Sequence, residues 1–515
     1  MILTFDFGSS VTKVALWGAG GLEALAGAPL RTTHPRPGWS EQDPHEWWAS
    51  LVAACASLRT QSPAAFGSVD VIGCTGARQT MALADAGGEP LGPAILWSDR
   101  RAADEATAVA ARMADAGGSP VGPSTTIDAA SVAAKIAWLT AHDPDRLAAC
   151  AWILTPRDLV VWWLTGVVCT DATMASRSGL YDREGRLVYA LAGDSARRLA
   201  PVFPSDRVSG TLTDRAAGEL GLTAGTPLVV GAGDRPCEVI GSGATEGGAM
   251  VSWGTTANVS IPVGRRPDGP LGGLVLSRSA DDGWLLEGGL SSAGSMVAWL
   301  GRLTGRTPEE LAELARLCRP GAGGVVATPW LEGARAPWWR DDATAGFVGL
   351  RPEHGPAELA RAVFESVAWD LLRCLESMAR LRPAGPPVSE LHLGGSGSGV
   401  AVWIDVLTGI AGVPVDRRRS GQAASAGAAV LAARAAGMEC PLDVVDPIGV
   451  RTEPEPEAVA AYRSLRGGSD RAAAAVLGLG RRSTATGDDR AAHDRAAHDR
   501  VAHARPPDRG DGPCD

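Results

Sequence analysis

The segment Asp6-Phe7-Gly8-Ser9-Ser10 places a carboxylate, a glycine and two hydroxyl groups in one short stretch near the start of the chain. Gly8 permits a sharp bend or the close approach of a ligand, and the two serines add donors beside exposed backbone N–H groups. This composition is typical of an anion-binding turn, and Asp6 can hold a divalent cation there. Alone, such a segment is usually only a turn.

A second copy of the pattern lies in the other half of the chain, where Gly254, Thr255 and Thr256 separate two apolar runs in the same order. Repetition at this distance indicates a duplicated α/β domain. Two glycine–hydroxyl turns facing one another would grip a polyphosphate from both sides. The alternative is a pair of unrelated hairpins.

Asp234 is the leading candidate for a catalytic residue. It follows the strand-like run 228–230 and the small residues 231–233, and Arg235-Pro236-Cys237 then begins a helix that is expected to reach about Gly241. α/β sheets bind ligands at the carboxyl ends of their strands, which is where this aspartate is expected. The alternative is a helix N-cap, and one residue can fill both roles.

Polar residues also end two further predicted strands. Arg78 and Gln79 follow the run 69–74, and Trp97 ends the run 94–97. A buried arginine and amide need partners, which either a polyhydroxylated ligand or an internal ion pair would supply. The small, polar segment 170–177 is expected to form a loop near a site.

The elements that must position these residues are α/β in character. Asp43, Pro44 and Glu46 predict a capped helix start, as Thr307 and Glu310 do in the second half. Apolar residues at every fourth position predict a long core helix over 359–375, and the run 391–399 reads as a strand followed by a glycine-rich turn.

Composition bounds the class of protein. The chain has 515 residues, enough for two or three domains, and its net charge of −10 argues against a nucleic-acid-binding surface. Nine scattered cysteines without a CxxC pair fit a reducing compartment better than a zinc site or a disulfide framework. The N-terminus does not read as a signal peptide, and no apolar run is long enough to span a membrane. We therefore expect a cytoplasmic protein.

Two boundaries follow from these patterns. We expect one domain over 1–243 and a second over 244–466. From about Gly467 the periodicity weakens, and the stretch 489–504 carries the near-repeat AAHDR-AAHDR-VAHAR. The tail 467–515 is therefore expected to be disordered.

The ordered set of motifs resembles the FGGY family of carbohydrate kinases from Met1 to about Leu465. The motifs are DFGSSVTK at 6–13, GWSEQDPHEWW at 38–48, AILWSDRR at 94–101, TPRDLVVWWLTG at 155–166, GAGD at 231–234, GTT at 254–256 and LHLGGSGSG at 391–399. The resemblance implies two ribonuclease-H-like domains of the actin and hexokinase type, closing across an interdomain cleft on ATP, Mg²⁺ and a sugar.

The same resemblance implies roles for individual positions. Asp234 matches the catalytic base, and Asp6 and Asp234 the residues near the metal. Arg78, Gln79, Trp97 and Asp234 match substrate contacts. The nucleotide side comprises Gly8, Ser9, Ser10, Lys13, Gly254, Thr255, Thr256, Gly394, Gly395 and Ser396. The implied activity is xylulokinase-like phosphorylation of a ketose or related polyol, with a small-molecule substrate, no nucleic-acid or membrane partner, and a homodimer as the candidate assembly.

The sequence departs from the family pattern in ways that leave the substrate open. Arg78-Gln79 is closer to the Arg-Glu pair of glycerol kinases than to the Gln-Met pair of xylulokinases, and Ala130 replaces an aromatic residue of glycerol kinases. Gly399 and Gly409 replace an Asn and an Asp of many relatives, which puts nucleotide affinity or helix stability in question.

Other functions also remain open. Glycerol, erythritol and gluconate kinases of the same family are alternatives. An actin- or chaperone-type nucleotide-binding regulatory module without sugar kinase activity is an alternative from another class, and a degenerate kinase with poor turnover is a third.

Overall fold

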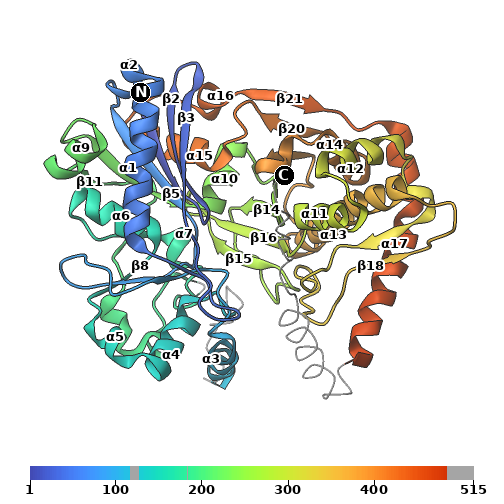
Figure 1. Ribbon diagram of the computed structural model, residues 1–515, viewed down its shortest axis with the longest axis horizontal. Helices are drawn as coiled ribbons and strands as arrows, with labels where there is room; N and C mark the ends of the chain where they lie inside the picture. Colours follow the sequence, from blue (N-terminus) through green and yellow to red (C-terminus); the bar gives the residue numbers. More distant parts are fainter. Residues whose placement is uncertain (116–126, 183, 484–515) are drawn as a thin grey trace, which may run out of the picture.

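Two β-sheets, one in each half of the chain, form the framework of the protein (Figure 1). The computed structural model describes residues 1–115, 127–182 and 184–483. The first sheet has the strand order β11-β12-β5-β1-β2-β3, and the second has the order β15-β16-β14-β13-β19-β20-β21. The first sheet comprises β1 (Ile2–Phe7), β2 (Val11–Gly18), β3 (Gly21–Pro29), β5 (Val71–Gly76), β11 (Val208–Thr211) and β12 (Pro227–Gly233). The second comprises β13 (Gly248–Trp253), β14 (Ala257–Val263), β15 (Val275–Arg278), β16 (Trp284–Leu290), β19 (Glu390–Gly394), β20 (Val415–Arg418) and β21 (Ile448–Thr452).

The two sheets share one topology. β1 pairs antiparallel with β2 and parallel with β5, just as β13 pairs antiparallel with β14 and parallel with β19. In the first sheet, β5 then pairs parallel with β12, and the antiparallel strand β11 forms the edge. In the second sheet, β19 pairs parallel with β20, and the antiparallel strand β21 forms the edge. This shared order confirms the predicted duplication and argues against two unrelated hairpins.

Alternation along β1 gives the first sheet two buried faces. Leu3, Phe5 and Phe7 pack with α1 (Pro44–Gln61), α6 (Pro156–Thr165) and α9 (Asp214–Leu220). Successive side chains of a strand point to opposite faces, so Ile2 lies on the other face, where α15 (Ala423–Ala435) covers it. An element from the second half of the chain thus completes the core of the first.

The helices α10 (Asp234–Ser242) and α15 pack against each other between the two sheets. A Cβ atom on Gly241 would overlap the carbonyl oxygen of Ala423, and one on Gly427 would overlap that of Cys237. Glycine therefore permits a backbone approach that no other residue allows. Thr4 on β1 and Ser425 on α15 add a buried hydroxyl–hydroxyl hydrogen bond of 2.6 Å between the two halves of the chain.

The predicted helix starts are largely confirmed. Asp43 accepts a hydrogen bond from the His45 N–H at 3.0 Å, and Thr307 and Glu310 form a reciprocal capping box. The expected reciprocal bond from Glu46 is wrong, because its carboxylate accepts instead from the Arg31 N–H at 3.1 Å. Glu46 thus fastens the end of the first sheet to α1.

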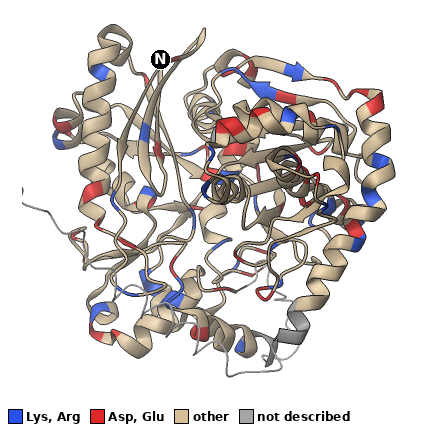
Figure 2. Cartoon of the chain, turned by 45° about the vertical axis from the view of Figure 1, so that its right-hand side comes forward, with Lys and Arg blue, Asp and Glu red and all other residues tan. Residues whose placement is uncertain are grey.

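The long core helix of the second half is α13 (Pro356–Leu381), which buries Val363, Val367 and Leu371 as predicted. The helices α11 (Gly294–Thr304), α12 (Pro308–Leu317) and α14 (Ala401–Ala411) pack with it in one apolar core. Figure 2 shows basic and acidic residues interspersed along the helices of both halves.

The chain stays helical beyond the predicted start of the tail. α17 runs over Pro456–Ser483, so the expectation of disorder from Gly467 is wrong for residues 467–483. Alanines rather than large apolar residues carry this part of the helix: Ala472, Ala473 and Val476 are buried, and Tyr462 anchors its first turns. The AAHDR repeats lie outside the described residues. Among the described residues, no helix is both long and apolar enough to cross a membrane.

Shorter elements complete the chain. They are β4 (Glu41–Gln42), α2 (Pro63–Phe66), β6 (Ala82–Ala84), β7 (Ala94–Ile95), α3 (Ala103–Asp115), α4 (Val132–His142), α5 (Pro144–Ala149), β8 (Trp152–Leu154), β9 (Thr170–Asp171), α7 (Ala172–Ala175), α8 (Tyr189–Ala192), η1 (Gly193–Arg198), β10 (Val202–Phe203), η2 (Ala322–Gly324), β17 (Val326–Thr328), β18 (Gly346–Val348), η3 (Ser396–Gly399) and α16 (Leu442–Val445).

Candidate active site

The carboxyl ends of three neighbouring strands bring the predicted residues of the first half together. Asp6 on β1 lies beside Thr75 on β5, and Gly76 on β5 lies beside Gly233 on β12. Arg78 and Asp234 follow β5 and β12 directly, so both emerge at the edge that carries Asp6. This is the edge at which open α/β sheets bind ligands.

The first glycine–hydroxyl loop is held from both sides. Its three residues, 8–10, connect β1 to β2, and the Ser9 carbonyl accepts a hydrogen bond of 2.6 Å from the Gln42 side chain. The indole N–H of Trp97 donates to the Ser9 hydroxyl at 2.7 Å. Lys13 reaches Gln422 of the second half at 3.2 Å. The hydrogen bond from Trp97 to Ser9 thus joins a predicted substrate contact directly to the predicted phosphate loop.

The second loop, residues 254–256, has the same length and connects β13 to β14. The N–H groups of Ala293 and Ser295, at the start of α11, donate to the Thr255 carbonyl at 3.0 and 3.1 Å. The side chains of Thr255 and Thr256 remain exposed. The loop backbone is therefore fixed while its hydroxyl groups stay free to contact a ligand.

Helix α10 contacts the strand that leads into the second loop. Glu238 on this helix accepts a hydrogen bond of 3.1 Å from Ser252, which lies just before the second loop. The pKa of Asp6 is raised to about 6, mainly by burial, with the nearby charges of Asp234 and Glu238 adding to the effect and that of Lys13 opposing it. These three carboxylates therefore sit close enough to repel one another.

Asp234 is open to a ligand. It is the first residue of α10, its side chain is 42% exposed, and its Oδ1 accepts a hydrogen bond of 2.8 Å from the Arg235 N–H. Gly233 occupies the N-cap position, so the N-cap alternative for Asp234 is not what the structure shows. Its Oδ2 makes no hydrogen bond or ion pair within the described part of the chain.

Arg78 joins Asp234 to the second sheet. Its Nε lies 3.4 Å from Asp234 Oδ1, and its two terminal nitrogens donate to Glu287 at 2.9 and 2.6 Å. Burial of Glu287 opposes its ionisation, but Arg78 prevails and lowers the pKa of Glu287 to about 2. The internal ion pair, one of the two alternatives from the sequence, is therefore correct for Arg78.

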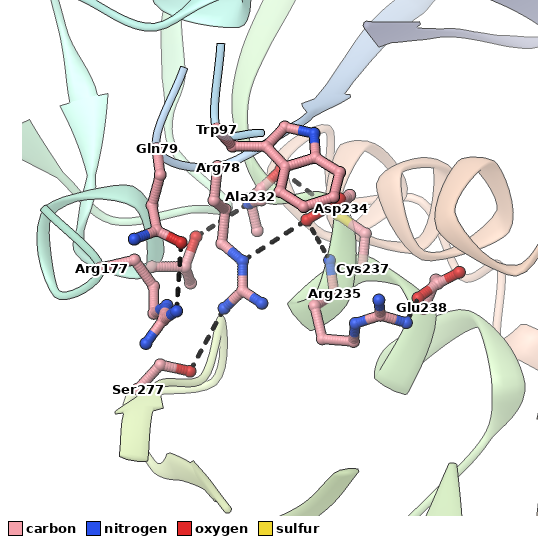
Figure 3. A network of polar contacts seen from close by, with 12 residues as sticks. Arg78, Gln79, Trp97, Arg177, Ala232, Asp234, Arg235, Cys237, Glu238 and Ser277 are labelled. Atoms are coloured by element: carbon pink, nitrogen blue, oxygen red, sulfur yellow. Dashed lines mark hydrogen bonds and ion pairs between the residues drawn. The ribbon is translucent and has the colours of Figure 1, made fainter. Parts of the chain in front are cut away.

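Gln79 adopts a strained backbone with a φ of 67°. Its carbonyl accepts a hydrogen bond of 2.6 Å from the buried Lys135, which also donates to the carbonyl of Leu96 at 2.8 Å. Its side-chain Oε1 accepts from Arg177 at 3.1 Å (Figure 3). Lys135 thus holds the backbones that present Gln79 and Trp97, and the segment 170–177 lies at the site as expected.

A cavity of about 870 Å³ opens beside the second loop. Its wall includes Trp253, Thr255, Gly397, Gly399 and Trp403. This volume is in the range of small-molecule and cofactor sites. Of the turn predicted to face the nucleotide, Gly394 and Gly395 are not on this wall, whereas the following residues Gly397, Gly399 and Val400 are. The side chain of Ser396 lies outside what the structure describes. A Cβ on Gly395 would overlap the Trp253 backbone, so this glycine lets the turn pack against the second loop.

A divalent cation fits the carboxylates at the first loop. No group of three or more potential metal-ligating side chains occurs among residues 1–115, 127–182 and 184–483. Mg²⁺ commonly uses only one or two protein carboxylates and takes its other ligands from phosphate and water. The raised pKa of Asp6 shows that its negative charge lacks full compensation. A cation shared by Asp6 and Asp234 would supply it.

Three residues of the site were not predicted from the sequence: Lys135, Glu238 and Glu287. Arg177 was predicted only as part of the segment 170–177. Glu287 carried a usable signal, because it is a lone acid in the apolar strand 284–290 and therefore required a buried cation. Lys135 carried a similar one as a lysine on the buried side of α4. Arg177 and Glu238 had no distinguishing local pattern.

Comparison with known proteins adds independent evidence. The model of the N-terminal domain of the FGGY family of carbohydrate kinases matches residues 1–241, and that of the C-terminal domain matches residues 249–436. A xylulose kinase of Escherichia coli is 30% identical over 450 residues, which cover 85% of this chain and 91% of that protein. A glycerol kinase of Methylibium petroleiphilum is 31% identical over 464 residues, covering 85% and 91%.

Solved structures show the same fold. A xyloylose kinase from Brucella ovis superimposes with a TM-score of 0.85 at 27% identity, covering 93% of this chain and 99% of that one. A gluconate kinase from Lactobacillus acidophilus superimposes with a TM-score of 0.82 at 20% identity, covering 92% and 98%. These similarities extend over both halves of the chain.

Proposed function

The chain belongs to the FGGY family of carbohydrate kinases, and from this premise we propose that it transfers the γ-phosphoryl group of ATP to a hydroxyl group of a ketose or related polyol. Its relatives at 30% identity or more include both xylulose kinases and glycerol kinases. Ala130 leaves more room than the aromatic residue that glycerol kinases are expected to carry there, which favours a larger sugar. Glycerol, erythritol and gluconate are the alternative acceptors within the same reaction.

Asp234 is the proposed general base, and its geometry is the observation that carries the proposal. Oδ1 is fixed by Arg78 and the Arg235 N–H, while Oδ2 has no partner among the described residues and the side chain is open to solvent. A carboxylate held at one oxygen and free at the other can accept the proton of a substrate hydroxyl. Proton transfer of this kind contributes roughly 10²–10⁴-fold to a rate.

The two glycine–hydroxyl loops are proposed to hold the phosphates. Phosphoryl transfer depends mainly on alignment and on neutralising the charge of the transferring group. Ser9, Ser10, Thr255 and Thr256 offer hydroxyl donors, and Lys13 adds a positive charge beside the first loop. Mg²⁺, held by Asp6 and Asp234, would neutralise phosphate charge. The cavity bordered by Trp253 and Trp403 would take the nucleoside.

The experiment is an ADP-release assay on the full chain with Mg²⁺ and ATP across xylulose, ribulose, glycerol, erythritol and gluconate. We expect sugar-stimulated ADP release with at least one acceptor, and its loss in Asp234→Asn. Asp194→Asn, on η1 and with a side chain that is 92% exposed, is the matched control. Acceptor-independent ATP hydrolysis would contradict the proposal and favour the regulatory-module alternative. Full activity in Asp234→Asn would contradict the role of Asp234 as general base.

A further inference from the structure

Gln79 and Arg177 form a pair of side chains with an excess of hydrogen-bond donors. The one hydrogen bond between them runs from Arg177 Nη2 to Gln79 Oε1, at 3.1 Å. Gln79 Nε2 and Arg177 Nε and Nη1 are shielded from water yet have no hydrogen-bond partner among the residues that the structure describes. Leaving a buried donor unpaired costs free energy. These atoms therefore call for a partner that the described residues do not supply.

The missing partner is an acceptor, because every unpaired polar atom of the pair is a donor. Arg177 makes no ion pair with the described residues, and its pKa is lowered first by burial and then by the charge of Arg78. The nearest acids are already engaged: Glu287 binds Arg78, and Asp128 accepts hydrogen bonds from the Ala130 N–H and the Ser131 hydroxyl. Glu287 and Asp128 therefore compensate the positive charge of Arg177 only in part.

The pair is fixed relative to the proposed base. Arg177 follows α7, whose Thr173 hydroxyl accepts a hydrogen bond of 2.8 Å from the N–H of Gly233, the residue before Asp234. Lys135 fixes the backbone of Gln79 from the other side. Figure 3 shows Gln79 and Arg177 on one side of Arg78 and Asp234 on the other. A sugar whose hydroxyl lies at Asp234 would extend past Arg78 toward this pair.

We propose that Gln79 and Arg177 form a subsite for an acceptor-only oxygen of the sugar, a keto or carboxylate oxygen, at the end remote from the hydroxyl that is phosphorylated. A hydroxyl group fits less well, because three atoms of the pair are unpaired donors and only the second lone pair of Gln79 Oε1 could accept its proton. The inference rests on the proposed function and deepens it by separating oxo sugars from the matching polyols.

The test compares acceptors that differ at this oxygen. The pairs are xylulose with xylitol and ribulose with ribitol for a keto oxygen, and gluconate with glucitol for a carboxylate. We expect kcat/KM to favour the oxo member of at least one pair by about 10-fold or more, since sites built around specific hydrogen bonds discriminate strongly. The pair with the larger ratio identifies which oxygen is bound.

Two variants assign the preference to the pair. Arg177→Met should lower kcat/KM for the oxo member more than for the polyol, so that the ratio approaches one. Gln79→Glu would place a carboxylate against Arg177, occupy its free donors and reduce the ratio in the same way. Arg197→Met removes an arginine that is 73% exposed, and it should leave the ratio as in the wild type. Circular dichroism checks that each variant is folded. If Arg177→Met does not fold, Gln79→Glu alone tests the role of the pair.

The outcomes separate the two proposals. Phosphorylation of sugars with ratios near one in every pair would overturn the subsite and leave the kinase function standing. If no acceptor is phosphorylated, the proposed substrate class fails, and calorimetric binding of the same pairs without ATP decides the subsite. Selective binding of oxo members that is lost in Arg177→Met supports it, and equal or absent binding overturns it.

Discussion

Arg78 of the first half and Glu287 of the second are joined by two hydrogen bonds of 2.9 and 2.6 Å. The same guanidinium reaches Asp234 through its Nε at 3.4 Å. The residue that orients the proposed base is therefore itself fixed by a strand of the opposite sheet. Any relative movement of the two halves would change the electrostatic environment of Asp234.

Glu287→Gln should weaken both folding and catalysis. The variant keeps the shape of the side chain but leaves the charge of Arg78 buried with only Asp234 to compensate it. We expect a loss of about 3 kcal/mol in the free energy of unfolding, measured by urea denaturation, together with a lower kcat. Glu453→Gln removes an acid that is 67% exposed and should change neither quantity. Wild-type stability and kcat in Glu287→Gln would contradict the role assigned to this pair.

Trp97→Phe should perturb the first phosphate loop. Phenylalanine keeps an aromatic ring but cannot donate the 2.7 Å hydrogen bond to the Ser9 hydroxyl. Because Ser9 is part of the loop proposed to bind phosphate, we expect KM for ATP to rise several-fold, the loss of about one hydrogen bond. Trp97→Ala removes the ring as well and should also raise KM for the sugar. An effect of Trp97→Phe on the sugar alone would show that the indole N–H does not act through Ser9.

Asp6→Asn should separate stability from function. The pKa of Asp6 is about 6 in the folded protein against 3.8 ordinarily, so its protonated form favours folding. This contribution is present below about pH 4 and is lost as the pH rises through 6. Without Mg²⁺ at pH 8, Asp6→Asn should therefore be more stable than the wild type by about 1–3 kcal/mol.

The same variant should lose activity, because an amide is a poor ligand for Mg²⁺. In the wild type, KM for Mg-ATP should rise as the pH falls from 7 to 5, since protons compete for Asp6. Thermal unfolding at pH 5 and pH 8 checks the first expectation, and steady-state kinetics over the same range checks the second. Equal stabilities of Asp6→Asn and wild type at pH 8 would show that the buried charge is already compensated.

Lys135→Met should weaken sugar binding indirectly, through the backbone segments that present Gln79 and Trp97. The lysine is fully buried, and burial lowers its pKa to about 7. It donates to three carbonyls on the segments that present Gln79 and Trp97. Methionine fills a similar volume but leaves those carbonyls unpaired, so we expect KM for the sugar to rise more than kcat falls.

The wild type should also lose sugar affinity as the pH rises through 7, because the neutral amine has one hydrogen fewer for three carbonyls. The lysine would no longer impose the strained backbone of Gln79. Two results would instead indicate a purely structural role for Lys135. One is a wild-type KM for the sugar that does not change between pH 6 and pH 8.5, and the other is a rise in KM that only equals the fall in kcat in Lys135→Met. Lys135→Arg tests whether the charge alone restores binding.

Local chemistry made much of this molecule predictable from its sequence. The glycine–hydroxyl loops, Asp234 at the end of a strand and the Thr307 capping box depend on residues within a few positions of one another. Glu287 and Lys135 depend on partners far away in the chain. In the sequence, each is marked only as a charged residue within an otherwise apolar element. Gly409, which the sequence suggests weakens its helix, has a tertiary explanation: a Cβ there would lie 2.9 Å from the ring of Tyr462 on α17.

The tail boundary failed for a related reason. The Ala-rich stretch after Gly467 has few large apolar residues, so its periodicity is weak. Small side chains nevertheless suit a helix that packs closely on its neighbours, and Arg373 on α13 binds Asp470 of α17 at 2.9 Å. Tertiary contacts of this kind override a weak local preference.

The crossing of α10 and α15 at Gly241 and Gly427 makes the two halves interdependent. A fragment ending at Gly243 would keep all six strands of its sheet but would expose to water the apolar face that α15 shields. The two pieces of a cleaved chain should therefore reassemble by complementation, because α15 of the second piece would cover the exposed apolar face of the first. The divided enzyme would then turn over substrate only when its two pieces have bound each other.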